Sequence, residues 1–169
     1  MKARTTVLTL LLAAHAQISA GEARATNPQP TFSAFPAEVA QHPGRVAEPR
    51  FATPAARRYR TVITHESRQG PNFAGHYRIA VWGCGTDCRG FAIVDLHSGR
   101  VYVDRKIETV AGIMGNDDPR LDFRLDSALL VISGQINEVE GSEARYFYAW
   151  DGKRLRLVEK RSLPLIPFD

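Results

Sequence analysis

The chain has 169 residues, 44% of them hydrophobic, which excludes wholesale disorder and suits one domain with a hydrophobic core. Its formal charge is +4, and two of the basic residues, Lys2 and Arg4, lie in a segment that we expect to be removed. The other lysines and arginines are interleaved with acidic residues, so the composition argues against a nucleic-acid-binding function.

The N-terminus has the pattern of a secretory signal peptide. Lys2 and Arg4 supply a positive region, and residues 5–14 form an apolar run that is too short to span a bilayer as a helix. Small residues follow, so we expect a signal peptide over residues 1–20, with cleavage as late as Ala25. Because no later segment is long and apolar enough for an anchor, we predict a periplasmic or secreted protein without stable membrane insertion.

A proline-rich segment comes next. Residues 26–53 are interrupted by prolines, which remove amide donors and fix φ, so we predict an extended arm. The hydrophobic residues that would pin parts of this arm onto the domain are Phe32, Phe35, Val39 and Phe51.

A single β-rich globular domain is predicted over residues 54–169, and it begins with a helix. Thr53 and Pro54 are typical of an N-cap followed by proline at the first helical position. Apolar residues then recur near one face through residue 68, and Gly70 ends the element. We therefore predict one amphipathic N-terminal helix.

From His76 onward the hydrophobic period changes to two, which indicates β-strands. The expected strands lie within residues 76–82, 91–96, 101–103, 121–126, 128–132, 146–150 and 155–157, and residues 105–119 are expected to form a loop. Asp151-Gly152 is the strongest hairpin signal. Tight turns make neighbouring strands antiparallel. The prediction is a mainly β (α+β) fold: an antiparallel sheet, small barrel or sandwich of six to seven strands with one N-terminal helix.

The chain contains two cysteines, Cys84 and Cys88, between two predicted strands. In an oxidising compartment such a pair normally forms a disulfide, and closing this short loop should contribute about 2 kcal/mol. Redox catalysis is the alternative, but redox dithiols usually sit two residues apart at a helix N-terminus. Here three residues intervene and Phe91 begins a strand, so we predict a structural disulfide.

The surroundings of this loop are the predicted binding site. His76, Arg78 and Trp82 share one face of a strand, where a titratable donor and aromatic area converge. Asn72 and Asp87 lie close by in the sequence and complete the set. The alternative is that His76 hydrogen-bonds a backbone carbonyl and Trp82 fills the core.

We expect neither a metal ion nor another cofactor. The histidines His65, His76 and His97 are widely spaced on different elements, and no spacing matches a zinc or calcium motif. A Ser-His-Asp hydrolase would need a nucleophile turn, and no G-x-S-x-G occurs.

Two motifs carry a resemblance to a known group. Residues 72–77 have the sequence NFAGHY, residues 82–88 have WGCGTDC, and a WDG hairpin follows at residues 150–152. The chain resembles a group of small exported bacterial proteins that share these features, over roughly Phe51 to Glu159. The resemblance implies an exported globular protein and implies no catalytic residue.

The sequence therefore favours a binding or accessory protein of the bacterial envelope. Its partner would be an envelope protein or a small molecule, without nucleic acid. The alternative is a small envelope hydrolase, or another enzyme, that uses His76 with Asp87 or Asp95 as the carboxylate. These alternatives differ in what they require: the enzyme needs His76 within reach of a carboxylate and lining an open cleft.

Overall fold

The computed structural model describes residues 27–39 and 44–163, so the predicted signal peptide lies outside the described residues. The helices are η1 (Phe32–Ala34), α1 (Pro54–Arg58) and α2 (Arg60–Ser67). The strands are β1 (Tyr77–Gly85), β2 (Cys88–Asp95), β3 (Val101–Tyr102), β4 (Val110–Ala111), β5 (Leu121–Phe123), β6 (Leu129–Ile136), β7 (Ala144–Trp150) and β8 (Leu155–Arg161).

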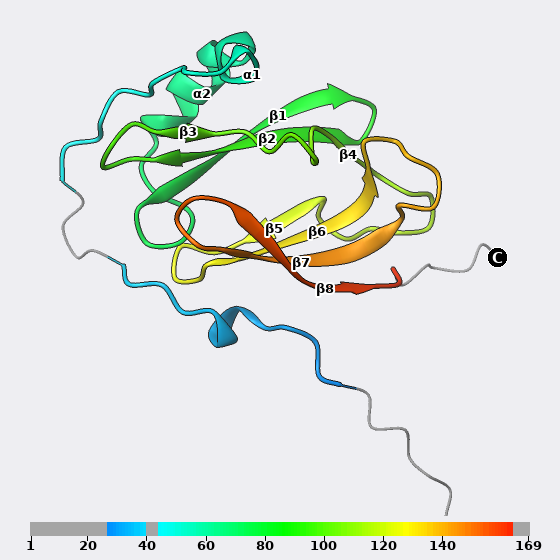
Figure 1. Cartoon of the computed structure of the whole chain (residues 1–169). Coiled ribbons are helices and arrows are strands. Elements are labelled where there is room, and N and C mark those ends of the chain that lie inside the picture. The colour runs from blue at the N-terminus through cyan, green and yellow to red at the C-terminus, as the bar shows by residue number, and fades with distance from the viewer. Residues whose placement is uncertain (1–26, 40–43, 164–169) are drawn as a thin grey trace, which may run out of the picture.

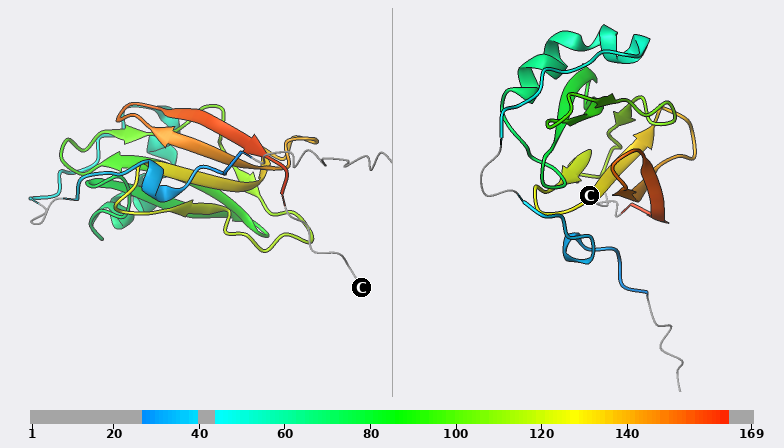
Figure 2. Two further views of the ribbon diagram at one scale, coloured as in Figure 1. Left: turned by 90° about the horizontal axis from the view of Figure 1, so that it is seen from below. Right: turned by 60° about the vertical axis from the view of Figure 1, so that its left-hand side comes forward.

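The strands form one antiparallel sheet that bends into two layers (Figures 1 and 2). Hydrogen-bonded neighbours follow the order β1-β2-β4-β6-β7-β8, with β3 beside β2 and β5 beside β6. In Figure 1, β1 to β3 form the upper layer and β5 to β8 the lower layer, and β4 pairs with both β2 and β6. The mainly β, antiparallel prediction is confirmed; the sheet is open rather than a closed barrel.

The strand that the sequence did not predict is β4, which lies within the predicted loop 105–119. It is two residues long and is followed by Gly112, so no alternation marks it in the sequence. The predicted hairpin at Asp151-Gly152 is confirmed, because β7 and β8 pair on either side of it.

The main core fills the space between the two layers. Ile79, Phe91, Leu130 and Ile132 are each at most 2% exposed there, and each contributes roughly 1.5–3 kcal/mol by burial. The neighbouring residue Ala80 is also fully buried, but on the other face, where the helices lie. β1 is therefore buried on both faces near its centre, whereas the sequence predicted one buried face.

The helices cover the outer face of β1 and β2 (Figure 1). The N-terminus of α1 is capped as predicted: the Thr53 hydroxyl accepts a 3.1 Å hydrogen bond from the Ala56 amide. The predicted single helix is divided at Tyr59, where φ is −105° and ψ is 19°. Ile63 packs against the sheet, and the Ser67 hydroxyl donates to its carbonyl at 2.7 Å. No helix within the described ranges is long and apolar enough to cross a membrane.

The proline-rich arm lies on both outer faces of the two-layered sheet. Phe32 and Phe35 pack on a third cluster outside β6 and β7, and Phe51 joins the cluster under the helices. The Ser127 hydroxyl is 2.9 Å from the carbonyl oxygens of both Phe32 and Phe35. Val39, in contrast, is 40% exposed, so it does not pin the arm as expected.

Candidate functional site

The tip of the β1–β2 hairpin is closed by the predicted disulfide. Cys84 and Cys88 are bonded, with their Cα atoms 5.1 Å apart. Between them Asp87 has a φ of 48°, and its carbonyl accepts a 2.8 Å hydrogen bond from the Gly112 amide. A Cβ atom at position 112 would lie 1.7 Å from the Asp87 carboxylate, so glycine allows this close approach.

A cavity of about 550 Å³ opens beside this tip. We call it the Arg120 cavity. Its polar lining consists of Asp87, Arg89, Asn116, Asp117, Asp118 and Arg120, and its apolar lining includes Val81, Leu121 and Phe123. The volume falls within the range of about 300–1,000 Å³ that is usual for small-molecule sites.

Arg120 contributes a buried guanidinium to this cavity. The side chain is 6% exposed, and its Nε lies 3.8 Å from Asp87 Oδ1. Nη2 donates to the carbonyl of Asn116 at 3.0 Å and to the carbonyl of Asp118. Nη1 is buried and has no hydrogen-bond partner among the described residues. Leaving a buried donor unsatisfied costs about 1–3 kcal/mol, and more when it is charged.

Asp118 forms part of the cavity wall. Burial alone would raise its pKa, but hydrogen bonds from Arg145 and Asn116 and the charges of Arg145 and Arg120 outweigh burial, and the pKa is lowered. The carboxylate is therefore ionised at neutral pH and bound to Arg145. This pairing leaves Asp87 and Asp117 as the carboxylates better placed to meet a ligand.

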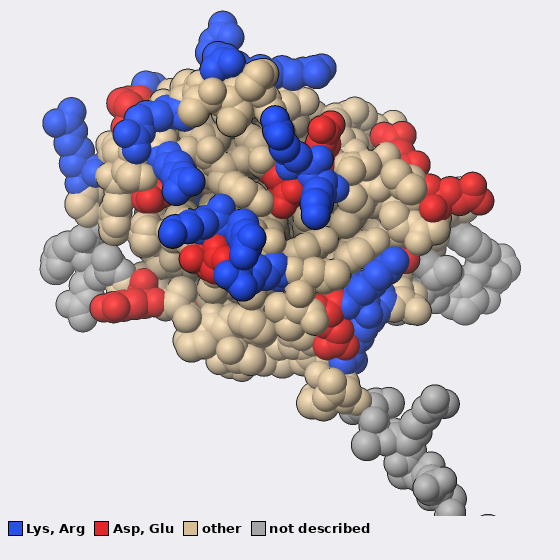
Figure 3. Space-filling model, in the orientation of Figure 1, with Lys and Arg blue, Asp and Glu red and all other residues tan. Residues whose placement is uncertain are grey.

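The charged side chains form no extended patch on the face shown in Figure 3. Lysine and arginine side chains alternate there with aspartate and glutamate over both layers of the sheet. A ligand that binds on this face is therefore recognised by the individual charged side chains that it contacts and not by a large region of one charge.

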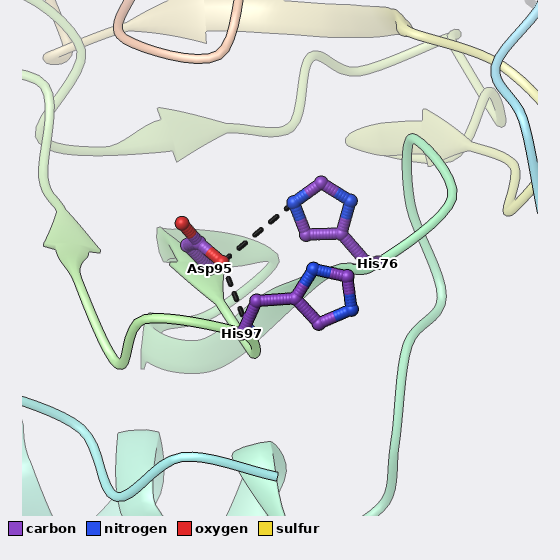
Figure 4. A group of neighbouring side chains, drawn as sticks. All are labelled: His76, Asp95 and His97. Carbon is purple, nitrogen blue, oxygen red and sulfur yellow. Dashed lines mark hydrogen bonds and ion pairs between the residues drawn. The ribbon is translucent and has the colours of Figure 1, made fainter. Parts of the chain in front are cut away.

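A second cluster lies at the opposite end of β1. His76, Asp95 and His97 place ligand atoms within 4.8 Å of one another (Figure 4). The two imidazole rings are stacked, with centroids 4.2 Å apart and planes 2° from parallel. His76 Nε2 lies 3.6 Å from Asp95 Oδ1. Burial lowers the pKa of His76, His97 lowers it further, and Asp95 offsets this in part, so the ring is neutral at pH 7.

Two of the predicted binding residues bond to the protein itself. The Asn72 side chain accepts from the Ile79 amide at 2.7 Å and donates to the Ile79 carbonyl at 3.1 Å. Arg78 forms a 2.6 Å ion pair with Glu66 of α2. Both interactions secure β1 to its surroundings.

The predicted set does not form one site. Trp82 stacks on Tyr59 with ring centroids 4.1 Å apart and lines a separate hollow of about 410 Å³ beside α1. Asp87 lines the Arg120 cavity, and His76 lies at the far end of β1. The shared strand face of His76, Arg78 and Trp82 is largely occupied by the helices.

Sequence reasoning missed Arg120 and the proximity of the histidines. Arg120 follows a loop without a motif, so no local signal identifies it. The proximity of His76 and His97 follows from a register in which Tyr77 pairs with Asp95, and an irregularity between Gly83 and Gly85 shifts that register by one residue from the pairing at the turn. That register brings the residues next to this pair together.

No protein-family model, curated protein or solved structure matches this chain. The resemblance based on the NFAGHY and WGCGTDC motifs therefore stays a prediction.

Proposed function

We propose that this protein is an exported binding protein whose Arg120 cavity takes a small, hydroxyl-rich molecule of the sugar class. The observation that carries the proposal is the Arg120 cavity itself, which has a volume of about 550 Å³ and a lining that combines carboxylates with guanidinium groups.

The chemical class follows from the lining of the cavity. Asp87 and Asp117 accept hydrogen bonds, whereas Arg89 and Arg120 donate them. A hydroxyl group does both, so a polyhydroxylated ligand can pair with either kind of group. Three carboxylates and two guanidinium groups line the cavity, which disfavours an anionic ligand. Phe123 adds an aromatic surface on which the C–H face of a sugar ring can lie.

The export part of the proposal is supported by the signal-like N-terminus and the disulfide. The apolar run at residues 5–14 follows two basic residues, and the Cys84–Cys88 bond is of a kind that persists in oxidising compartments. We place the protein in the periplasm or outside the cell, as a carrier or as an accessory to an envelope protein.

The enzyme alternative has less support. His76 is near a carboxylate, but the hollow that it lines has a volume of only about 20 Å³, which is too small for an organic substrate. Asp87, the other carboxylate considered, lies beyond the opposite end of β1. A histidine-dependent hydrolase would need both groups at an open cleft.

A titration with sugars tests the proposal. A panel of mono- and disaccharides is screened by thermal shift on mature protein, and the best binder is measured by calorimetry. Gly112→Ala drives the Asp87 carboxylate out of its position, whereas a Cβ at Gly83 has nothing within 4 Å. We expect Gly112→Ala to weaken binding at least about tenfold, a change of roughly 1.4 kcal/mol, and Gly83→Ala to leave it unchanged. A panel without binders, or equal affinities in both variants, would contradict the proposal.

A further inference from the structure

We propose a second site, for a divalent transition-metal ion, formed by His76, Asp95 and His97. The three side chains each offer a ligand atom, and these atoms lie within 4.8 Å of one another (Figure 4). The cluster and the Arg120 cavity lie at opposite ends of β1, so this site does not depend on the proposed sugar-binding function.

The carboxylate is already held in place. Asp95 Oδ1 accepts hydrogen bonds from the amides of His97 at 2.9 Å and Ser98 at 3.2 Å. Asp95 Oδ2 accepts from the Ser98 hydroxyl at 2.6 Å. Outer partners of this kind orient a ligating carboxylate and reduce the entropy that metal binding would otherwise cost.

His76 is also fixed by its surroundings. Its backbone follows Gly75, which has a φ of 82° and lies so close to the arm that a Cβ there would be 2.1 Å from the Glu38 carbonyl oxygen. Its amide donates to the Ala74 carbonyl, and its ring lies 4.1 Å from that of Tyr77. Two of the three ligands are therefore positioned before a metal arrives.

His97 is the adjustable ligand. A metal ion lies near the plane of each imidazole that binds it, so two parallel stacked rings cannot share an ion without a rotation. His97 is exposed, so its ring can turn at little cost, whereas the ring of His76 also lies against that of Tyr77. Binding should therefore unstack the pair by moving His97.

The ligand set selects the kind of ion. Two imidazoles and one carboxylate suit zinc and related transition metals, whereas calcium and magnesium prefer sets made only of oxygen atoms. Three protein ligands leave coordination positions open to solvent.

Calorimetric titration of the tag-free mature protein with zinc chloride tests this site. We expect one zinc per chain, at least tenfold weaker binding in His97→Ala and in Asp95→Asn, and no comparable binding of calcium chloride. Asp95→Asn keeps an acceptor for the turn amides while it removes the charge. The control is His65→Ala, which removes an exposed histidine on α2 and should bind as the wild type does.

A second measurement separates loss of a ligand from loss of the fold. Because His97 is exposed, His97→Ala should keep the melting temperature of the metal-free wild type within about 2 °C. Imidazole proton NMR signals of His76 and His97, but not of His65, should shift when zinc is added. Absence of saturable zinc binding would overturn the proposal, as would equal affinity in wild type, His97→Ala and Asp95→Asn.

Discussion

Replacing Asn72 with alanine should destabilise the fold rather than remove a ligand contact. Its amide group pairs with both backbone groups of Ile79, as a neighbouring strand would on this edge of the sheet. Ile79 is 1% exposed, so water has poor access to the groups left behind. Each unsatisfied backbone group costs about 1–3 kcal/mol, and the two bonds are partly buried, so we expect Asn72→Ala to lower the free energy of unfolding by about 2–4 kcal/mol.

Urea unfolding followed by circular dichroism measures this loss, and two further variants sharpen it. Asn72→Asp keeps an acceptor for the Ile79 amide but places a carboxylate against the Ile79 carbonyl, so at pH 7 it should be at least as harmful as alanine. Gln69→Ala removes an exposed amide nearby and should change stability by less than about 0.5 kcal/mol. The reasoning is refuted if Asn72→Ala unfolds at the wild-type urea concentration.

Three more outcomes are expected. Replacing both Cys84 and Cys88 with serine should lower the free energy of unfolding by about 2 kcal/mol in urea titrations, and dithiothreitol should then have no further effect. The pKa of Asp118 is lowered in the fold, so its contribution is present above its ordinary value of 3.8 and is lost as pH falls through the lower folded pKa. Arg145→Met should therefore cost about 1 kcal/mol at pH 7, and wild type and variant should converge in acid titrations of stability. Burial raises the pKa of Tyr148 to about 12, so its stabilising contribution should fade between pH 10 and about 12, and Tyr148→Phe should lose less stability over that interval.

Hydrophobic patterns predicted most of the strands, because a strand with one buried face alternates hydrophobic and polar residues and a strand buried on both faces is a continuous apolar run. The same rule could not find β4, since two residues show no period and its pairing partners are distant in the chain. It also could not show that the helix divides at Tyr59, where the ring turns to stack on Trp82. Long-range contacts decide both features.

The candidate sites were harder to predict from the sequence than the fold. Motif-based reasoning selected the neighbourhood of the disulfide, and Asp87 does line a cavity there. It assigned binding to Asn72 and Arg78, whose hydrogen bonds are internal, because sequence spacing does not reveal partners such as Ile79 and Glu66. Arg120 became a candidate because it lines the same cavity as Asp87, and only the tertiary structure brings these two residues together.

The arm has a consequence for the order of assembly. Phe32 and Phe35 leave the ribosome early, but the hydroxyl that anchors them belongs to Ser127, 95 residues after Phe32. Their docking surface on β6 and β7 does not exist until that later part of the chain has been made and paired. Such a distant closure is slow compared with the β1–β2 hairpin. A chain whose arm has not yet docked therefore leaves Leu129, Val131 and Phe147 uncovered, and apolar surface exposed in this way makes a partly folded chain prone to aggregate.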